Sequence, residues 1–262
     1  VGLFVGWPAT IACDLSPDVV GLYRAVSAAP GAVAARLVEA CVAYAGQDDA
    51  RRPNGGYYGA RATYNAIAWG GDDARKAALL LYLNKRGYNG LCRVNADGHW
   101  NVPQGKSSSG DWHPAPLPVA LDVLAAFARA TARWVWTRGD FAEAVAGARA
   151  GDVVFADPPY ADPDKERRAS KMFTGYTSGG FGPRDQDRLA DALAAARDRG
   201  AVVVHTNADS AAIRALYRAR GFWTLPTAEL RSVNREGEGR SRKPCLIACS
   251  HPEVLTAPDP GE

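Results

Sequence analysis

Several features that would place this chain in a special class are missing, and long apolar runs are the first of them. Apolar stretches such as residues 77–81 and 201–204 are far shorter than the roughly 20 residues that a helix needs to cross a bilayer. No basic and apolar leader opens the sequence, so nothing argues for secretion. We therefore expect a cytoplasmic protein that makes no membrane contact.

Cysteine is scarce and poorly spaced for pairing. The five cysteines are an odd number, and no two of them have CxxC spacing. Neither a disulfide framework nor a zinc site is indicated, so we expect no metal. Methionine is scarcer still, because Met172 is the only one. Since the chain lacks an initiator and starts with the strand-like residues 1–6, we expect its N-terminal part to be incomplete.

An excess of charge of one sign is also missing. Lys and Arg number 31 against 28 Asp and Glu, which gives a net charge of +3. This balance permits nucleic acid as a partner but does not demand it. Basic residues do gather at residues 231–243, a run that includes Arg231 and Asn234. Taken alone, such a run is a solvated loop, and phosphate contact becomes the better interpretation only if other features indicate DNA.

What the sequence does contain is a regular alternation of short apolar runs and helical periods. The predicted strands are residues 3–5, 10–13, 134–136, 153–156 and 202–205, and a closing antiparallel hairpin is predicted at 223–225 and 246–249. The predicted helices among them are residues 140–149, 184–199 and 211–220. This alternation favours an α/β fold with a mostly parallel, doubly wound, Rossmann-like sheet.

A second kind of segment interrupts this alternation. Helices are predicted at residues 19–26, with Ser16 as N-cap, at 31–46, from about 60 to 84 with a break before Asp72, and at 119–131, with a polar loop at 48–59. Residues 86–110 are rich in Gly, Asn, Arg and Ser, and the Asp97-Gly98 pair predicts a hairpin turn. We therefore expect an inserted, mostly helical domain with a β-hairpin at residues 31–131, and a sheet domain formed by residues 1–30 and 132–262.

The most informative chemistry follows the predicted strand at residues 153–156, in the motif Asp157-Pro158-Pro159-Tyr160. Ligands of open α/β sheets lie at the carboxyl ends of the strands. Consecutive prolines fix φ and remove backbone donors, so their carbonyls can face a ligand. Asp157 can accept a hydrogen bond from an amino group, and Tyr160 offers a flat face. The set suits a planar nucleobase with an exocyclic amine, although a strand that runs into a Pro-rich turn is the plain alternative.

Other candidate ligand contacts lie at the ends of further predicted strands. Asp14 ends the second strand, where an acidic side chain can accept hydrogen bonds from ribose hydroxyls. Phe4 and Gly6 lie where a glycine turn lets the backbone approach a ligand. Asp140, which precedes Phe141, could lie near an adenine amino group. Asp14 and Asp140 are equally interpretable as residues that cap helices.

Residues 82–106 combine aromatic, amide and basic side chains in a short segment. Its candidate contacts with nucleic acid are Tyr88, Asn89, Arg93, Asn95 and Lys106. Amides and guanidinium groups read base edges, and basic groups contact phosphates. For any single Asn, turn formation is the alternative interpretation.

These residues carry a resemblance to a known family. The block that begins Tyr-Leu-Asn-Lys-Arg-Gly-Tyr-Asn-Gly-Leu-Cys-Arg-Val-Asn at residue 82 and ends Asn-Val-Pro-Gln-Gly at residue 105 resembles the recognition-domain signature of the Dam-type DNA adenine methyltransferases. The motif at residues 157–160 is similar to the catalytic motif of that family. Further matches follow in order to residue 234, so the resemblance covers nearly the whole chain.

The resemblance implies a methyl donor, S-adenosylmethionine, and an acceptor, the 6-amino group of an adenine flipped out of double-stranded DNA. Asp157, Pro158, Pro159 and Tyr160 would be the catalytic residues, with Tyr160 stacked on the flipped base. The implied donor-binding residues are Phe4, Gly6, Asp14, Asp140, Phe141 and Asp157. The expected DNA-binding residues are Tyr88, Asn89, Leu91, Arg93, Asn95, Lys106, Arg231 and Asn234. A GATC-like target and a monomeric enzyme are expected.

One departure from the family pattern concerns the donor pocket. The family normally begins with a Trp-Ala-Gly-Gly-Lys-like segment, and only residues 7–10 separate Gly6 from the strand that leads to Asp14. The pattern therefore predicts an incomplete donor pocket. Two alternatives stay open, a catalytically impaired DNA-binding relative and an enzyme that methylates another amine, in cytosine or RNA. Roles in DNA replication, in phage or in restriction-modification are equally open.

Overall fold

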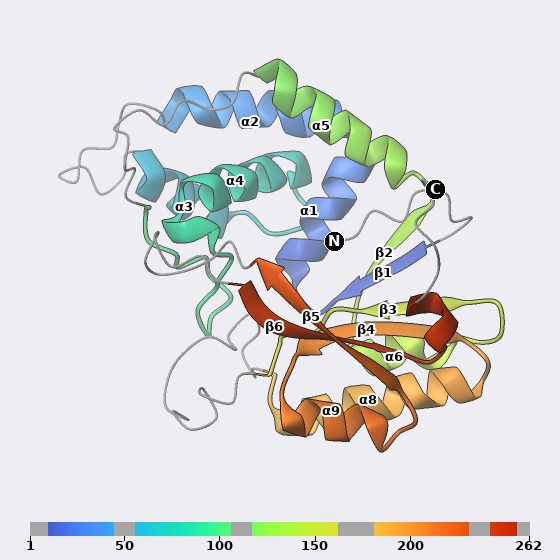
Figure 1. Cartoon of the computed structure of the whole chain (residues 1–262). Coiled ribbons are helices and arrows are strands. Elements are labelled where there is room, and N and C mark those ends of the chain that lie inside the picture. The colour runs from blue at the N-terminus through green and yellow to red at the C-terminus, as the bar shows by residue number, and fades with distance from the viewer. Residues whose placement is uncertain (1–9, 45–55, 106–116, 162–180, 231–241, 256–262) are drawn as a thin grey trace. The chain divides into compact units, whose positions relative to one another are not determined.

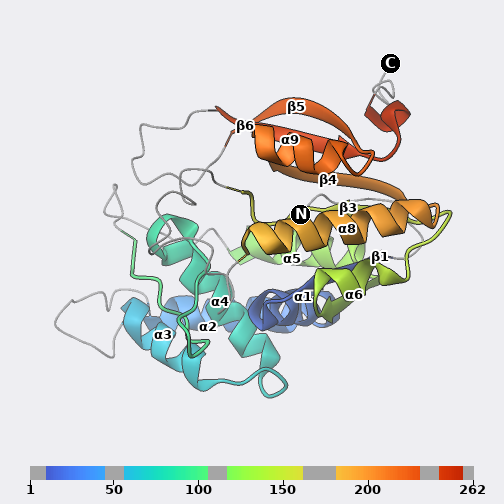
Figure 2. The same cartoon turned by 90° about the horizontal axis from the view of Figure 1, so that it is seen from below.

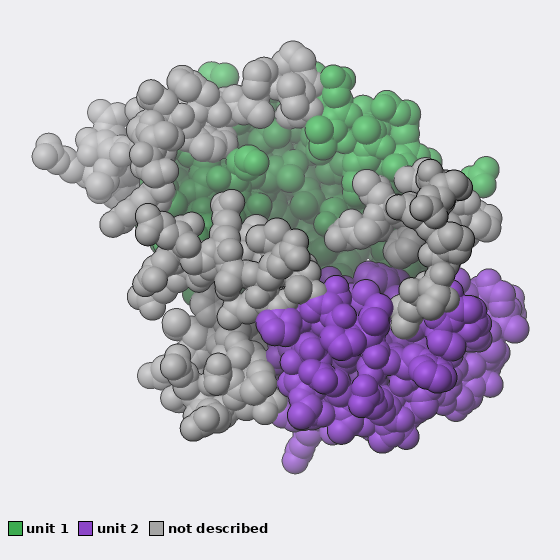
Figure 3. Space-filling model, viewed as in Figure 1, with its two compact units in different colours: residues 1–139, 176–178 green, residues 140–175, 179–262 purple. Residues whose placement is uncertain are grey.

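The computed structural model describes residues 10–44, 56–105, 117–161, 181–230 and 242–255. These residues form a mixed α/β structure, shown in Figure 1. It divides between Gly139 and Asp140 into two compact units (Figure 3), which we call unit 1 and unit 2. The predicted division into residues 31–131 and the remainder stays a prediction.

Unit 1 is mostly helical. Its helices are α1 (Pro17–Ala28), α2 (Pro30–Tyr44), α3 (Gly56–Ala66), α4 (Asp73–Arg86), the single turn η1 (Tyr88–Gly90) and α5 (Leu117–Ala130). The predicted N-cap is confirmed, because the Ser16 hydroxyl accepts a hydrogen bond from the Val19 N–H at 3.3 Å. The polar loop predicted at residues 48–59 is wrong at its C-terminal end, because α3 already begins at Gly56. Tyr57 is fully buried there, so packing of this ring favours helix over the loop that the glycines suggested.

Membrane crossing can be assessed from helix length and apolarity. No single described helix meets both requirements; α1 and α2 meet them only as a pair, bent by 114° at the break between them.

Unit 1 also contains two parallel strands, β1 (Thr10–Asp14) and β2 (Trp134–Arg138), in the register that pairs Ala12 with Trp136. Both strands were predicted. Helix α1 packs on them, because the Tyr23 ring stacks on Trp136 at 4.7 Å between centroids and the Arg24 Nε donates to the Trp136 carbonyl at 2.8 Å. The strand predicted at residues 3–5 lies outside the described residues.

The segment after η1 is held onto α3 by buried polar contacts. The Tyr57 hydroxyl donates to the Val102 carbonyl at 2.9 Å and accepts from the Trp100 Nε1 at 3.0 Å. Asn65 bonds to both backbone groups of Trp100: its Oδ1 accepts from the Trp100 N–H at 2.8 Å, and its Nδ2 donates to the Trp100 carbonyl at 3.2 Å. These contacts attach the segment to the helical core.

The hairpin predicted in this segment is present only as a turn. The chain reverses direction at Gly98, whose φ is +78°, and Val94 pairs with Trp100 in an isolated antiparallel bridge. A second isolated bridge joins Gly87 and Gln104, but the described part of the segment contains no β-strand. In the register of the first bridge Leu91 would next exchange hydrogen bonds with Pro103, but proline has no N–H and the Leu91 N–H is bonded to the Tyr88 carbonyl at 3.1 Å, so the ladder ends there.

Unit 2 carries the larger sheet. Its elements are α6 (Phe141–Ala146), β3 (Val153–Ala156), α8 (Pro183–Asp198), β4 (Val202–Ala208), α9 (Ala211–Arg218), β5 (Trp223–Leu230), β6 (Arg242–Cys249) and η2 (Pro252–Leu255). The strands lie in the order β3-β4-β6-β5; β3 and β4 are parallel, and β6 is antiparallel to both of its neighbours. This confirms the predicted strands and the closing hairpin (Figures 1 and 2).

Helices α8 and α9 cover one face of this sheet (Figure 2). Along β4 every second side chain, Val203, His205 and Asn207, is buried toward that face. On the opposite face Phe155 and Trp223 are 43% and 59% exposed. A doubly wound sheet has helices on both faces, and within the described residues of unit 2 helices cover one.

His205 is one of the buried polar residues in the core of unit 2. The ring is fully buried and lies 3.9 Å from the Tyr217 ring, between centroids. Among the described residues neither of its nitrogens has a hydrogen-bond partner. Burial therefore lowers the pKa of His205 to about 4. The unfolded chain binds a proton at His205 below about pH 6.5, whereas the folded chain does not until about pH 4.

We predict that His205 makes unit 2 less stable as the pH falls from 6.5 to 4, by up to about 3 kcal/mol. His205→Phe keeps an aromatic ring but cannot titrate, so it should flatten the pH dependence of the free energy of unfolding in this window. Denaturant unfolding at several pH values measures this. The same substitution at the exposed His99 is the matched control and should leave the slope unchanged. Equal slopes for His205→Phe and wild type would contradict the assignment.

Candidate active site

The motif of residues 157–160 begins where β3 ends, beside the end of β4. The register pairs Ala156 with His205, so Asp157 lies next to Thr206. The Thr206 hydroxyl donates to Asp157 Oδ1 at 2.5 Å. This confirms that the two strand ends share one edge of the sheet, as expected for parallel neighbours.

Two buried amides hold the backbone of this loop. The Gln186 Nε2, from α8, donates to the Pro159 carbonyl at 3.1 Å. The Asn207 Oδ1, from β4, accepts from the Ala161 N–H at 3.1 Å. Both contacts flank Tyr160. Gln186 was not among the predicted site residues. Its position in the apolar stripe of α8, one turn before Leu189, was the available signal, because a polar side chain there has to be buried.

The functional atoms of the motif remain accessible. Asp157 is exposed, and Tyr160 is half-buried. The bond from Thr206 uses one carboxylate oxygen of Asp157, and a carboxylate has about four acceptor positions. The loop can therefore present a fixed carboxylate, the Pro158 carbonyl and an aromatic ring to a planar ligand that carries N–H donors.

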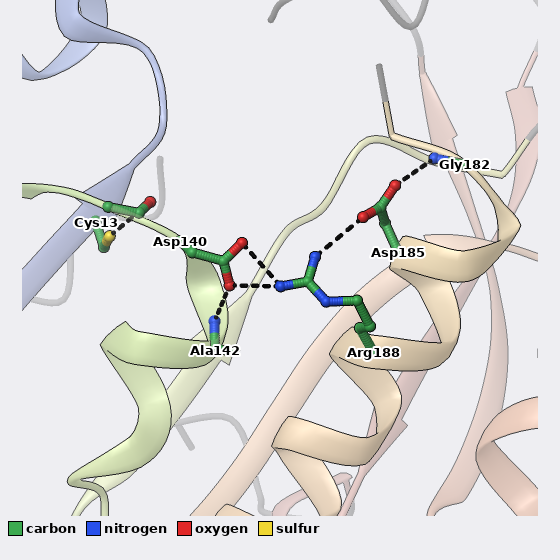
Figure 4. A network of polar contacts seen from close by, with 7 residues as sticks. Cys13, Asp140, Ala142, Gly182, Asp185 and Arg188 are labelled. Atoms are coloured by element: carbon green, nitrogen blue, oxygen red, sulfur yellow. Dashed lines mark hydrogen bonds and ion pairs between the residues drawn. The ribbon is translucent and has the colours of Figure 1, made fainter. Parts of the chain in front are cut away.

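Asp140 is a helix cap and an ion-pair partner at once, as Figure 4 shows. Its Oδ1 accepts from the Ala142 N–H at 2.9 Å, which caps α6. The Arg188 guanidinium donates to both of its oxygens, at 3.1 and 3.0 Å, and also to Asp185. Asp140 and Asp185 together raise the pKa of Arg188. The predicted contact of Asp140 with an adenine amino group remains a prediction beside this structural role.

Phe141 lies under the same arginine. The Arg188 guanidinium carbon is 4.9 Å from the centre of its ring, and the Phe181 ring meets it edge-on at 5.9 Å between centroids. The exposed pair of Asp140 and Arg188 contributes little to stability by itself, because solvent screens it. Its effect is to fix both side chains in one geometry.

Asp14 ends β1 with an exposed carboxylate. Its Oδ1 accepts from the Ser16 N–H at 2.7 Å, so the side chain participates in the start of α1, as the capping interpretation predicted. This bond leaves Oδ2 for other donors. The role predicted for Asp14 with ribose hydroxyls is compatible with this arrangement and stays a prediction.

Tyr88 and Asn89 form a sharp corner directly after α4. Asn89 has a φ of +52°, in the left-handed region, and it is exposed. The Asn84 Nδ2 donates to the Gly90 carbonyl at 2.7 Å and closes the turn. Tyr88 and Leu91 are partly buried against the core of unit 1, so the corner projects Asn89 outward from a fixed base.

Arg93 and Asn95 both make contacts inside their own segment. The Arg93 Nε donates to Asn101 Oδ1 at 2.8 Å. Asn95 Oδ1 accepts from the N–H groups of Asp97 and His99, at 3.1 and 2.9 Å. The turn interpretation is therefore realised for Asn95, and its predicted DNA contact stays a prediction. Arg93 keeps further donors, since a guanidinium has five N–H groups.

Five of the predicted site residues lie outside the described residues: Phe4, Gly6, Lys106, Arg231 and Asn234. A search of the described ranges finds no group of three His, Cys, Asp or Glu side chains that could hold a metal ion.

Comparison with known proteins gives this site its context. The profile of the D12 class N6 adenine-specific DNA methyltransferases matches residues 7–233, which is most of the chain. The chain belongs to this family. The match includes β1, where Asp14 lies, and the motif of residues 157–160.

Individual relatives agree with the family. The chain is 37% identical over 186 residues to the DNA N-6-adenine-methyltransferase of Escherichia phage P1, a match that covers 71% of this chain and 23% of the phage protein. It is 32% identical to the Retron Ec67 DNA adenine methylase of Escherichia coli over 81% of this chain and 66% of that protein. A DNA adenine methylase of Vibrio cholerae serotype O1 is 30% identical, over 92% of this chain and 79% of that protein. The chain thus spans less than two thirds of the first two relatives.

The two roles of Asp140 can be separated by substitution. We predict that Asp140→Ala lowers the free energy of unfolding by about 1 kcal/mol, because α6 loses its cap. Asp140→Asn should cost much less, since Asn caps helices as well as Asp does. Thermal and denaturant unfolding measure both. If the two variants were equally destabilised, the cap would not be the main structural contribution of Asp140.

Proposed function

We propose that this chain transfers a methyl group from S-adenosylmethionine to the 6-amino group of adenine in double-stranded DNA. Family membership supports the reaction class. The observation that carries the proposal is the loop of residues 157–160, which is held from both sides at the carboxyl ends of β3 and β4. The proposal includes a monomeric, cytoplasmic enzyme that works without a metal, and the doubly wound sheet with a recognition domain at residues 31–131.

The acceptor side follows from the hydrogen-bonding groups of the loop. An adenine 6-amino group has two N–H donors, and the Asp157 carboxylate and the Pro158 carbonyl are two acceptors. Accepting both hydrogens leaves the nitrogen lone pair directed out of the base plane. S-adenosylmethionine, when bound, supplies a methyl group on a positively charged sulfur. Catalysis by these residues is then largely a matter of positioning, which can account for several powers of ten in rate.

The target base has to leave the duplex to reach Asp157. Flipping costs a few kcal/mol of stacking and pairing. Stacking on an aromatic ring returns roughly 1–3 kcal/mol per base. Tyr160 is the ring in the motif that would supply this platform, and it is half-buried.

The donor side rests on Asp14, Asp140 and Phe141 among the described residues. Their chemistry fits the donor, since carboxylates accept hydrogen bonds from ribose hydroxyls and from an adenine amino group, and an aromatic ring can stack on adenine. Asp14 keeps one carboxylate oxygen outside its bond to Ser16. Phe4 and Gly6 complete the proposed pocket.

Target recognition is assigned to the segment that follows α4. Tyr88 is proposed to wedge into the duplex, and Asn89, Leu91 and Arg93 to read bases of a GATC-like sequence. The exposed, left-handed corner at Asn89 supports this, because it presents an amide away from the core. Asn95 and Lys106, together with Arg231 and Asn234, are proposed to contact the DNA backbone.

Methylation of a plasmid, followed by digestion with methylation-sensitive restriction enzymes, tests the whole proposal. We expect protection at GATC-like sites that depends on S-adenosylmethionine. Protection only from restriction enzymes that are blocked by cytosine methylation would favour a different amine. If the protein binds DNA but shows no detectable donor binding at millimolar donor, it is a catalytically impaired DNA-binding relative, and the catalytic proposal is wrong.

Asp157→Ala should reduce methyl transfer by at least 100-fold and leave DNA affinity near normal. The substitution removes an acceptor for the amine, whereas the proposed DNA contacts lie elsewhere in the chain. Initial rates with labelled donor and a DNA-binding titration measure the two effects. Asp152→Ala, at the opposite end of β3, is the matched control and should behave like wild type. Comparable transfer by Asp157→Ala and wild type would refute the role of Asp157.

Arg93 is predicted to discriminate bases through its planar fork. Arg93→Lys keeps the charge but loses bidentate hydrogen bonding, so it should lose about 1–3 kcal/mol of discrimination between target and altered sites. Its affinity for unrelated DNA should change little. The ratio of transfer rates on matched oligonucleotides that differ in one base pair measures this. Arg75→Lys, at an exposed position of α4, is the control, and an unchanged ratio in Arg93→Lys would argue against base reading.

A further inference from the structure

A series of hydrogen bonds through two side-chain amides, all donating in the same direction, connects the two ends of the loop at Tyr160. The Ala161 N–H donates to Asn207 Oδ1 at 3.1 Å, and the Asn207 Nδ2 donates to Gln186 Oε1 at 2.9 Å. The Gln186 Nε2 then donates to the Pro159 carbonyl at 3.1 Å. The chain therefore begins and ends on the backbone of one loop, on either side of Tyr160.

The polarity of this chain leaves no alternative orientation for either amide. A backbone N–H such as that of Ala161 can only donate, so it must meet an oxygen of Asn207. The Pro159 carbonyl can only accept, so it must meet the nitrogen of Gln186. The inner ends then face each other as Asn207 nitrogen and Gln186 oxygen, which is a matched pair. The Ala208 N–H adds a second bond to Asn207 Oδ1, at 2.8 Å, and fixes that end further.

Both amide side chains are buried. Gln186 is 5% exposed, and Asn207 is fully buried. Their neighbours on the same face of α8 and β4, Leu189 and Val203, are apolar and equally buried. A buried amide costs free energy unless all of its groups are bonded, so an apolar residue would pack there without this requirement. What the two amides add over apolar side chains is the fixed shape of the loop.

We propose that Gln186 and Asn207 are positioning residues that fix the position and orientation of Tyr160 relative to the target base. This inference rests on the proposed function. The bonds hold the carbonyl before Tyr160 and the N–H after it, so the backbone on both sides of the ring is fixed. Thr206 does the same for the adjacent Asp157 through its 2.5 Å bond. Together the side chains of α8 and β4 preset the acceptor pocket before DNA arrives.

Gln186→Glu tests the proposal, because it keeps the shape of the side chain and replaces the Nε2 donor by an oxygen. An ionised Glu would place an acceptor against the Pro159 carbonyl, so the loop should shift. A displacement of about 1 Å near a reacting group can reduce a rate by about 100-fold. We expect kcat to fall 10- to 100-fold, while the Kd for DNA stays within about threefold, since the DNA contacts proposed for unit 1 are unaffected.

The pH dependence of this defect is the readout that a merely structural role would not give. A protonated Glu can donate its O–H to Pro159 and accept from Asn207, which restores the chain. The ratio of wild-type to Gln186→Glu kcat should therefore increase with pH. A ratio that stays constant with pH, or a loss that appears in Kd instead of kcat, overturns the proposal.

Asp187→Asn is the matched control for the chemistry of the substitution. It exchanges acid and amide on the same helix, one residue away, but Asp187 is exposed and lies 3.6 Å from Arg220. Its kcat should be within twofold of wild type. Asn207→Asp is the second test variant, because it keeps the acceptor for Ala161 and loses the donor to Gln186. We expect it to reproduce the loss of kcat, and wild-type kcat in both variants overturns the proposal.

Hydrogen exchange separates this inference from the proposed function, since it needs no activity. Prolines carry no amide hydrogen, so a peptide that covers the motif reports mainly on Asp157, Tyr160 and Ala161. Exchange there should be faster in Gln186→Glu than in wild type and in Asp187→Asn. Unchanged exchange overturns the positioning role. A wild-type protein that leaves adenine unmethylated overturns the proposed function instead, whatever the exchange rates are.

Discussion

The parallel pairing of β3 with β4 is the constraint on which the candidate site depends. Parallel neighbours end at the same edge of a sheet, so Asp157 and Thr206 come together although 49 residues separate them along the chain. The crossover between the two strands contains α8, which packs against β4 and brings Gln186 under the loop. Three side chains from two elements, Gln186 of α8 and Thr206 and Asn207 of β4, thus fix a short motif that has few backbone donors of its own.

Unit 1 uses a related device to hold an irregular segment. Residues 91–105 form no described strand, yet their backbone is bonded to Tyr57 and Asn65 of α3. In both units side-chain amides bond to the backbone on each side of a ring: the half-buried Asn65 does so at Trp100, and the buried Gln186 and Asn207 do so at Tyr160. In both loops side-chain hydrogen bonds, together with apolar packing, hold the backbone in one conformation.

Local pattern was enough to predict most of the elements. The strands β1 to β4 and the closing hairpin of β5 and β6 were predicted because each is a short apolar run between turn residues. The N-terminal end of α1 followed from its cap, Ser16. The prediction failed at two places. Helix α3 begins in a glycine-rich stretch because Tyr57 is buried there. The Asp97-Gly98 turn did not extend into strands because Pro103, which would bond to Leu91 in the same register, has no N–H.

The sequence by itself determined the family, the position of the motif at a strand end and the chemistry of its groups, because these depend on residue type and order. It could not identify the residues that hold the motif. The sequence places Asn207 after the end of the neighbouring strand and Gln186 in a helix, but it does not show that either side chain contacts the motif, and Asp140 is compatible with both a cap and a ligand contact. Only the tertiary structure brought Gln186, Asn207 and the loop together, because hydrogen bonds between distant segments depend on strand register and helix packing.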